Sequence, residues 1–405
     1  MTNISNSGLN SLLIYLSLIG FPIVGVFSQI LNVESFFYST ILRSIVGIVS
    51  LLIVFINLKK INVFKKNLFL LIFTIFIILY CFRIYIDTII LDLPLLKDTF
   101  YYWVWFYGAC LLPFIAIILC DKIDFIKNNM KYYLYFILLI VTILSLVFGS
   151  SMMVSEYNQD IYNSGRFRLE SINPISLGHI GVILSTLSIY LFKPSKYSLL
   201  SLINILSFIL GVYLTILSNS RGPLIALCFI LIFILTRKYR KFFIVLPIFL
   251  FLLSFFLFYL YSFISTNYEI YTFDRFLSIG NSVNNLDDER FYLYKSAFNG
   301  FLNYPLFGYG LEDYKSGYYP HNYYIEAFMS TGFFGGVSFL LVSFYLFFKS
   351  LFFEYKYLWV SIFYIDNFIS GMFSGAIYSS ANFWVSLALV FSLILYSKRF
   401  NDNIS

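Results

Sequence analysis

Long apolar runs, separated by segments rich in Lys or Arg, constrain this chain more than any other feature of its sequence. An apolar run of about 20 helical residues spans the roughly 30 Å hydrocarbon core of a bilayer. Of the 405 residues, 60% are hydrophobic and 12% are charged, about half the charged fraction of a soluble domain. Because an open sheet would leave backbone groups unpaired in lipid, the sequence predicts an all-α polytopic membrane protein.

The apolar runs predict twelve transmembrane helices. We expect them at residues 9–30, 37–58, 67–86, 99–120, 132–149, 175–192, 197–217, 221–236, 242–264, 322–348, 357–377 and 380–397. No Lys or Arg precedes the first run, so we expect a retained span and not a cleaved signal peptide. The twelve helices would form a single transmembrane domain over residues 1–405, with two long outer loops at 150–174 and 265–321.

With this count, every connection rich in Lys or Arg falls on one side of the membrane. These connections hold seventeen of the 27 basic residues, namely Lys59, Lys60, Lys65, Lys66, Lys122, Lys127, Lys131, Lys193, Lys196, Arg237, Lys238, Arg240, Lys241, Lys349, Lys356, Lys398 and Arg399. The positive-inside rule makes this the cytoplasmic side. Both termini are then expected in the cytoplasm, and the two long loops on the outer face.

The ten basic residues that remain are embedded or external, and seven of them are Arg. The planar guanidinium group suits bidentate binding of phosphate or carboxylate. This bias points to an anionic ligand on the outer side, with pairing to the outer carboxylates as the alternative.

Four cationic or titratable groups fall in one layer when depth is counted from the cytoplasmic anchors. At 1.5 Å per residue, Arg43, Arg83 and Arg221 each lie roughly 24–26 Å from the inner edge. His179 lies roughly 21 Å from that edge. Such groups usually face a cavity or a partner, and snorkelling to the outer headgroups is the alternative. Asp366 lies roughly 15 Å in, where we expect a structural partner.

The segment Ser218–Pro223 joins two predicted spans with almost no loop. Pro223 suits the first turn of a helix. The helix start would present free N–H groups and a positive dipole beside Arg221, a combination that favours a bound phosphate. A simple tight turn is the alternative.

The loop at 265–321 is rich in Tyr and ends at His321. Tyr rings suit sugar faces, although an interfacial loop is also rich in Tyr. A helix is predicted near residues 289–302, with an apolar face of Phe291, Tyr294, Phe298 and Leu302. Pro305 and Gly308 follow as terminators.

His321 lies 28 residues from Lys349, or roughly 42 Å along a helix, and is therefore at or above the outer headgroups. Asn322 is expected to cap the following helix, with Glu326 on the same face. Gly332, Gly335 and Gly336 would permit close helix contact. A structural role for this histidine is the alternative to a catalytic one.

Three of these patterns together resemble the O-antigen polymerase and O-antigen ligase superfamily of bacterial membrane glycosyltransferases. The patterns are Ser218–Gly222, like the family's Ser-Arg-Gly; Arg290 with Pro305–Leu311, like Arg…Pro-Leu-X-Gly-X-Gly; and His321–Ile325 with Gly332 and Gly335, like His-Asn-X-X-Leu…Gly-X-X-Gly. The resemblance covers residues 166–336. Tyr294 stands where the family commonly has Trp.

The resemblance implies a GT-C-like fold and a glycan donor carried on undecaprenyl pyrophosphate in the outer leaflet of the bacterial inner membrane. The acceptor would be a second lipid-linked repeat unit for a polymerase, which we favour, or lipid A–core for a ligase. Membrane lipid and a chain-length regulator protein are further expected partners; no nucleic acid, cofactor or metal is expected. A flippase for the lipid-linked glycan is the alternative from another class, although the two pseudo-repeats typical of transporters are not evident.

Within this scheme, Arg221 and Arg290 neutralise the donor pyrophosphate, and His321 activates the acceptor hydroxyl. Further candidates for substrate binding are Arg166, Arg168, Arg275, Arg43, Arg83 and His179. Glu326 and Glu170 are the alternative bases. Asp287-Asp288-Glu289 could mark a metal site, but we expect a solvated acidic run that pairs with Arg290 or Lys295.

Overall fold

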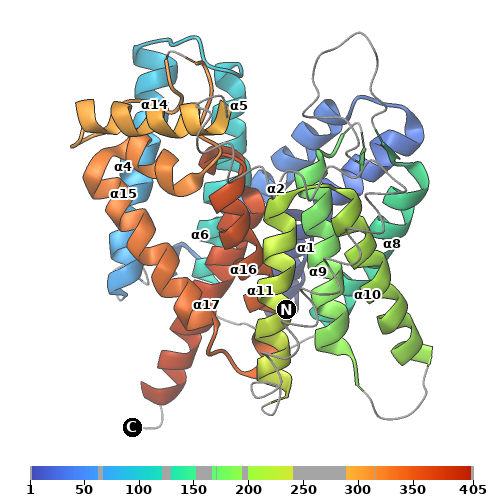
Figure 1. The fold of residues 1–405 in the computed structure, drawn as a ribbon. Helices are drawn as coiled ribbons and strands as arrows, with labels where there is room; N and C mark the ends of the chain where they lie inside the picture. The colour runs from blue at the N-terminus through green and yellow to red at the C-terminus, as the bar shows by residue number, and fades with distance from the viewer. Residues whose placement is uncertain are drawn as a thin grey trace, which may run out of the picture. The chain divides into compact units, whose positions relative to one another are not determined.

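The computed structural model is built almost entirely of helices (Figure 1). It describes residues 2–62, 67–120, 129–151, 167–169, 171–193, 199–239, 289–314 and 316–402. Within these ranges the only strands are β1 (Ser150–Ser151) and β2 (Phe167–Arg168), which pair antiparallel. The prediction of an all-α protein is therefore confirmed for the described residues.

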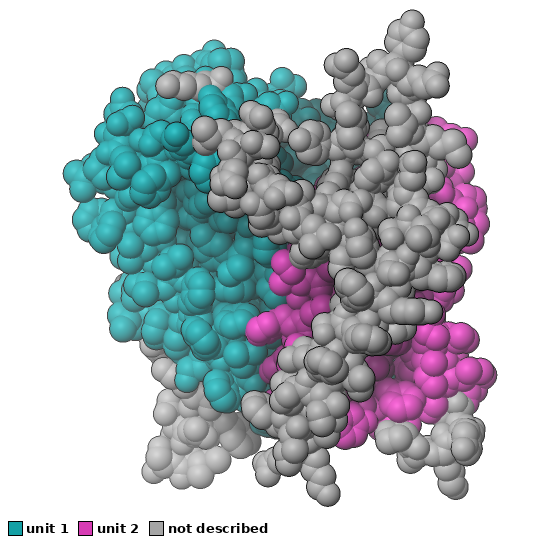
Figure 2. Space-filling view, viewed as in Figure 1, with its two compact units in different colours: residues 1–24, 34–134, 287–405 teal, residues 25–33, 135–286 magenta. Residues whose placement is uncertain are grey.

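Contacts group the chain into two compact units, which we describe separately (Figure 2). The first comprises residues 1–24, 34–134 and 287–405, and the second 25–33 and 135–286. The first holds α2 (Ser35–Ile56), η1 (Leu58–Lys60), α4 (Leu68–Tyr85), η2 (Ile86–Ile90), α5 (Thr99–Trp103), η3 (Val104–Leu111), α6 (Leu112–Leu119), α14 (Glu289–Asn303), α15 (Tyr323–Ser350), η5 (Tyr355–Tyr357), α16 (Leu358–Phe373), η6 (Ile377–Ser379) and α17 (Ala381–Asp402). The second holds α9 (Pro174–Leu191), α10 (Leu199–Leu217) and α11 (Arg221–Lys238), while α1 (Thr2–Leu31) and α8 (Met130–Phe148) run across the boundary.

Eight helical stretches among the described residues are long and apolar enough to cross a membrane. They are Gly8–Leu31, Ser35–Ile56, Leu68–Ile90, Thr99–Leu119, Met130–Phe148, Pro174–Leu191, Leu199–Leu217 and Tyr323–Ser350. Each coincides with a predicted span, so the chain is a multi-pass membrane protein. Three further predicted spans fall on α11, α16 and α17, and the span predicted at 242–264 lies outside the described residues. The count of twelve, the GT-C-like arrangement and the orientation stay predictions.

Aromatic side chains form the core of the first unit. The rings of Phe73 and Phe76 on α4 pack against Phe339 on α15, with centroids 6.2 and 4.7 Å apart. The same two rings contact Trp384 on α17. All four side chains are fully buried, and each such ring pair adds about 0.5–1.5 kcal/mol beyond the burial of its area. This packing holds α15 against α4.

Helix α14 confirms the helix predicted near residues 289–302. In Figure 1 it lies crosswise over the end of α15, which it contacts. Its buried face consists of Leu293, Ala297 and Gly300. Phe291 and Phe298, on the apolar face predicted for this helix, are 54% and 56% exposed, so that face is not the buried one. In a membrane protein an apolar side chain can face lipid, so apolarity alone does not identify the inner face of a helix.

Helix α15 is broken at Gly332, which has a φ of 68° and a ψ of −161°. The segment that follows α14 fills the break. The Phe333 N–H donates to the Pro305 carbonyl at 2.7 Å, and the Tyr309 N–H donates to the Met329 carbonyl at 2.6 Å. Since unpaired backbone groups are costly in lipid, this exchange of hydrogen bonds stabilises both segments.

Two glycines make this close approach possible. A Cβ atom at Gly332 would lie 2.4 Å from the carbonyl carbon of Leu306, and one at Gly308 would lie 2.4 Å from that of Ser330. Gly308 also has a positive φ of 81°. Gly332 was predicted to permit close contact between helices, and this prediction is wrong. The residue breaks its own helix, and the loop after α14 packs against it. Gly335 does face a neighbouring helix, since its Cβ would lie 3.4 Å from Leu79 Cδ1 on α4.

The second unit is assembled around α9, which crosses α10 and α11 at small residues. A Cβ at Gly181 would lie 2.5 Å from the Gly211 carbonyl oxygen of α10. A Cβ at Gly178 would lie 2.8 Å from Pro223 Cγ of α11. Small residues let membrane helices approach closely without apolar burial as a driving force.

Replacing Gly308 or Gly332 with Ala should strongly destabilise the protein, because the new methyl group would collide with backbone atoms. Gly317→Ala is the matched control, since Gly317 also has a positive φ (66°) but has no atom within 4 Å of its Cβ position. That variant should lose only the roughly 1–2 kcal/mol cost of the left-handed backbone. Thermal melting of the detergent-purified variants measures the difference, and equal melting temperatures for all three would contradict the packing described here.

Candidate functional site

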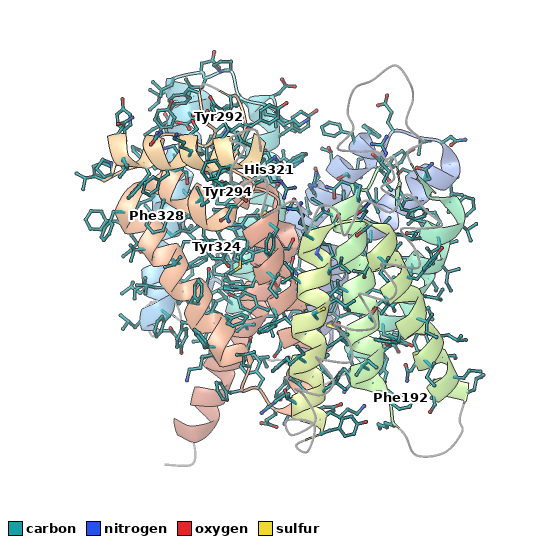
Figure 3. The ribbon with its side chains drawn as sticks, in the orientation of Figure 1. Phe192, Tyr292, Tyr294, His321, Tyr324 and Phe328 are labelled. Atoms are coloured by element: carbon teal, nitrogen blue, oxygen red, sulfur yellow. The ribbon has the colours of Figure 1, made fainter. Side chains whose placement is uncertain are left out.

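His321 lies in the turn that leads into α15. Figure 3 shows it at the end of the first unit that also carries Tyr292 and Tyr294 of α14. Asn322 caps the helix, with Oδ1 accepting the N–H groups of Tyr324 at 3.0 Å and Ile325 at 3.1 Å. The predicted cap is thus confirmed. His321 itself has a positive φ of 53°, a conformation uncommon outside glycine and often found at functional sites.

Arg290 and Asn322 both bind the C-terminal end of α16. Asn322 Nδ2 donates to the Met372 carbonyl at 2.9 Å, and Arg290 Nη1 donates to the Phe373 carbonyl at 3.4 Å. The last carbonyls of a helix carry partial negative charge, which favours a guanidinium group there. The helix end therefore brings together Arg290 and His321, which the sequence placed in two separate motifs.

The charge state of His321 follows from these surroundings. Burial and the positive charge of Arg290 lower the pKa of His321 to about 4. The imidazole is therefore neutral at neutral pH and retains one nitrogen that can accept a proton. A neutral imidazole beside a cation suits a group that must accept a proton next to an anionic ligand.

A line of aromatic rings connects His321 with a buried carboxyl group that the sequence reasoning missed. The Tyr319 ring lies 4.4 Å from His321 and 6.1 Å from Tyr378. The Tyr378 ring lies 4.5 Å from Tyr102, whose hydroxyl donates to Glu312. Burial raises the pKa of Glu312, which is 1% exposed. The feature of the sequence that could have pointed to Glu312 is its position directly after the Gly-Tyr-Gly-Leu segment.

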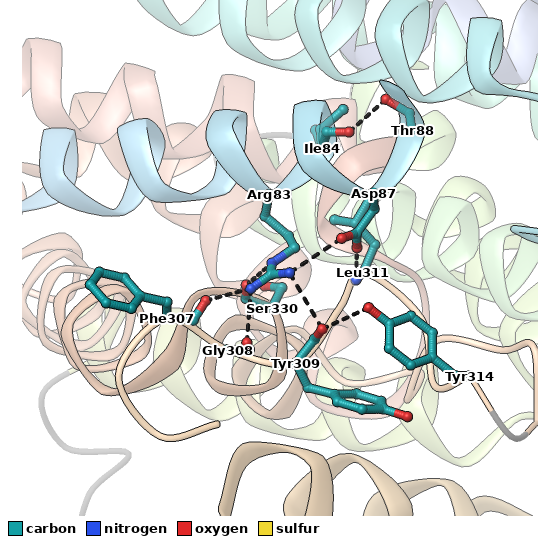
Figure 4. A network of polar contacts seen from close by, with 10 residues as sticks. All are labelled: Arg83, Ile84, Asp87, Thr88, Phe307, Gly308, Tyr309, Leu311, Tyr314 and Ser330. Atoms are coloured by element: carbon teal, nitrogen blue, oxygen red, sulfur yellow. Dashed lines mark hydrogen bonds and ion pairs between the residues drawn. The ribbon is translucent and has the colours of Figure 1, made fainter. Parts of the chain in front are cut away.

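Arg83 clamps that segment to α4 (Figure 4). All five of its N–H groups have an acceptor: the carbonyls of Ser330 (2.9 Å), Tyr309 (3.3 Å), Phe307 (2.8 Å) and Gly308 (2.8 Å), and Asp87 Oδ1 (3.2 Å). Asp87, in the π-helical turn η2, also accepts the Leu311 N–H at 2.7 Å. The pair therefore joins α4, α15 and the loop between α14 and α15.

Two predicted substrate contacts are corrected by these bonds. Arg83 has no donor left for a pyrophosphate, since a guanidinium group has only five, so its role is structural. Glu326 was expected as an alternative base, but it is 0% exposed. Its oxygens accept the Tyr80 hydroxyl at 2.7 Å and the Ile377 N–H at 3.0 Å. A carboxylate held in this way supports η6 and is not positioned for a substrate.

Arg43, in the same predicted layer as Arg83, has different surroundings. Its guanidinium carbon lies 4.2 Å from the centroid of the Trp105 ring and 5.7 Å from that of Phe21. The side chain is half-buried. It belongs to the first unit, as do Arg290 and His321.

Arg221 and His179 belong to the second unit. Arg221 is the first residue of α11 and follows Asn219, which has a φ of 46°. Pro223 lies in the first turn of the helix, as predicted. His179 is buried in α9, and Arg168 is half-buried in β2.

Several predicted residues lie outside the described part of the chain: Arg166, Glu170, Arg275, Asp287 and Asp288. Among the described residues, no group of three or more His, Cys, Asp or Glu could hold a metal ion. The four cysteines are free thiols. Asp366, expected to be a structural partner, is 2% exposed in α16.

Part of the chain matches a known protein family. Residues 206–340 match the family described as O-antigen ligase. The matched segment ends within α15 and includes Arg221, Arg290 and His321. It confirms the resemblance to the O-antigen polymerase and ligase superfamily. No curated protein matches the chain.

The clamp predicts that Arg83→Lys will destabilise the protein nearly as much as Arg83→Gln. Lysine keeps the charge, but its three donors cannot pair with five acceptors in this fixed geometry. Disruption of a buried, paired charge costs about 3–5 kcal/mol, which thermal melting of the ligand-free protein would detect. A wild-type melting temperature for Arg83→Lys, together with a raised KM for a lipid-linked donor, would instead make Arg83 a substrate ligand.

Proposed function

We propose that this chain, which carries the O-antigen ligase family segment, is an O-antigen polymerase. It transfers a glycan from undecaprenyl pyrophosphate to a second lipid-linked repeat unit at the outer face of the bacterial inner membrane. The observation that carries the proposal is that the C-terminal end of α16 binds both Arg290 and Asn322, which places the cation near the neutral His321 at the start of α15. A cation that can bind a diphosphate and a group that can accept a proton are what this transfer requires.

The reaction follows from these two groups. The acceptor hydroxyl attacks the anomeric carbon of the donor sugar and forms the new glycosidic bond. The bond between that carbon and the pyrophosphate oxygen breaks, and undecaprenyl pyrophosphate leaves with the electron pair. His321 accepts the hydroxyl proton. Arg290 neutralises the charge that develops on the leaving group.

Donor binding would also strengthen the base. In the free protein the charge of Arg290 contributes to the low pKa of His321. A pyrophosphate bound to Arg290 offsets this charge, which raises the pKa of the imidazole. His321 is then a better proton acceptor when the donor is in place than when the site is empty.

The remaining predicted contacts belong to the same proposal. Arg221, at the first turn of α11 in the second unit, stays a predicted contact for the pyrophosphate, as the N-terminus of its helix favours an anion. Arg166, Arg168, Arg275 and His179 are further candidates for substrate binding, and Glu170 is the alternative base.

A ligase is the second candidate, because the matched family is described as O-antigen ligase. The two enzymes differ in the acceptor and share the donor chemistry, so the residues around His321 suit both.

Purified protein given a lipid-linked repeat unit should produce a ladder of longer lipid-linked glycans. His321→Ala should reduce turnover about 10²–10⁴-fold, the usual contribution of a general base, and Arg290→Ala should reduce it comparably. Lys356→Gln is the control, since Lys356 forms an exposed ion pair with Glu354. Transfer only to lipid A–core would identify a ligase, and undiminished activity in His321→Ala would remove the proposed base.

The effect of the Arg290 charge on the pKa of His321 can be tested with diethyl pyrocarbonate. The rate at which this reagent modifies His321 is measured as pH is varied. A His179→Gln background leaves His321 as the single histidine. Only the neutral imidazole reacts, so the midpoint should lie near the pKa of about 4. Arg290→Gln removes a charge that disfavours the imidazolium, and the midpoint should therefore rise toward the usual value of about 6.5. An unchanged midpoint would show that Arg290 does not act on His321.

A further inference from the structure

Arg43 and Trp105 form a cation–π pair within the first unit. Arg43 lies in α2, and its guanidinium carbon is 4.2 Å from the centroid of the Trp105 ring. Trp105 lies in η3, a π-helical segment between α5 and α6. π-helical turns are rare and are frequent at functional sites. Contact with the ring restricts the Arg43 side chain, so less freedom remains to be lost when a ligand binds.

Both members of the pair have hydrogen-bond donors that find no acceptor among the described residues. In the part of the chain that the structure describes, Arg43 makes no hydrogen bond or ion pair, whereas Arg83 uses all five of its donors. The Trp105 Nε1–H is buried and likewise lacks an acceptor among the described residues. An unsatisfied buried donor such as the Trp105 N–H is uncommon and costly. Next to the positive charge of Arg43, it favours an anion as the missing partner.

The same ring connects the pair with the His321 site. Trp105 stacks on Tyr378, with centroids 6.2 Å apart and planes 13° apart. Tyr378 contacts Tyr319, which contacts His321. Arg43 and Trp105 both lie outside the segment 206–340 that matches the family, so the match assigns them no role.

We infer that Arg43 and Trp105 form a binding subsite for the phosphate group of a lipid. A guanidinium group stacked on an aromatic face still presents its N–H groups in its own plane, where they bind phosphate oxygens bidentately. Arg43 lies in a membrane-spanning helix, where an ionisable group is expected to face a partner, and the anions available there are lipid phosphates. If the proposed function holds, this lipid is one of the two undecaprenyl-linked substrates; the subsite itself does not depend on that function.

The test is a titration of the detergent-purified full chain, followed by tryptophan fluorescence. The probes are undecaprenyl pyrophosphate without glycan, phosphatidylglycerol, and undecaprenol, which has no phosphate. Undecaprenyl pyrophosphate should change the fluorescence, and Trp105→Phe should remove most of this change. Trp103→Phe is the matched control and should keep it, because the Trp103 N–H already donates to Thr88 at 3.1 Å.

Arg43→Gln should weaken binding about ten- to a hundredfold, the range for loss of a charge-assisted hydrogen bond. Arg43→Lys should give an intermediate affinity, because it keeps the charge without the planar fork. Wild-type affinity in Arg43→Gln, a full signal in Trp105→Phe, or an equal response to undecaprenol would each overturn the subsite. A response to both phosphate lipids that Arg43→Gln abolishes would support the subsite and assign it to phospholipid headgroups.

A transfer assay separates failure of the subsite from failure of the proposed function. An Arg43→Gln variant with a raised KM and a nearly unchanged kcat supports the subsite as part of the reaction. Phosphate binding without any transfer by the wild-type protein would reject the proposed function and keep the subsite. Transfer by Arg43→Gln with wild-type KM and wild-type binding would reject the subsite and keep the function.

Discussion

Lipid offers no hydrogen bonds, so a break in a membrane helix has to be paired from within the protein. In the first unit this constraint acts at Gly332, where α15 loses its helical conformation. The loop after α14 supplies the missing partners, and Gly308 lets it approach to backbone contact. Arg83 then pairs with the carbonyls that remain on both segments. The Pro-Leu-Phe-Gly-Tyr-Gly segment therefore fills the break that Gly332 makes in α15, and each segment pairs the backbone groups of the other.

The loop packed into the break of α15 positions the candidate site without taking part in its chemistry. The loop connects the end of α14 with the turn at His321, and α14 carries Arg290 at its start. The C-terminal end of α16 then binds Arg290 and Asn322 directly. A fixed loop and a fixed helix end together restrict where the guanidinium and imidazole groups lie. Such restriction of catalytic groups is a large part of how a site lowers a reaction barrier.

Hydropathy predicted the membrane helices well, because length and apolarity follow directly from the thickness of the bilayer. Local rules also gave α14 and the Asn322 cap, since both depend on neighbouring residues. The sequence did not show which way the apolar face of α14 points, because lipid and protein interior are equally apolar and Phe291 and Phe298 do not reveal which one they face. Arg83 could not be told from Arg43 by depth, because the difference lies in loop carbonyls more than 200 residues away in sequence. Glu312 was missed for the same reason, since its burial depends on Tyr102 and Leu96.

Arg83 and Arg43 differ in how their charge is stabilised within the first unit. A buried charge is tolerated when hydrogen bonds replace its hydration, and Arg83 meets this condition within the protein. Arg43 does not meet it with any residue that the structure describes, and an aromatic stack replaces only part of the lost hydration. Arg290 lies at the start of α14 and is exposed, so water can solvate its charge until a substrate displaces it. A lipid-linked anion would therefore meet a solvated guanidinium group at Arg290, and at Arg43 a half-buried one that has no hydrogen-bond acceptor among the described residues.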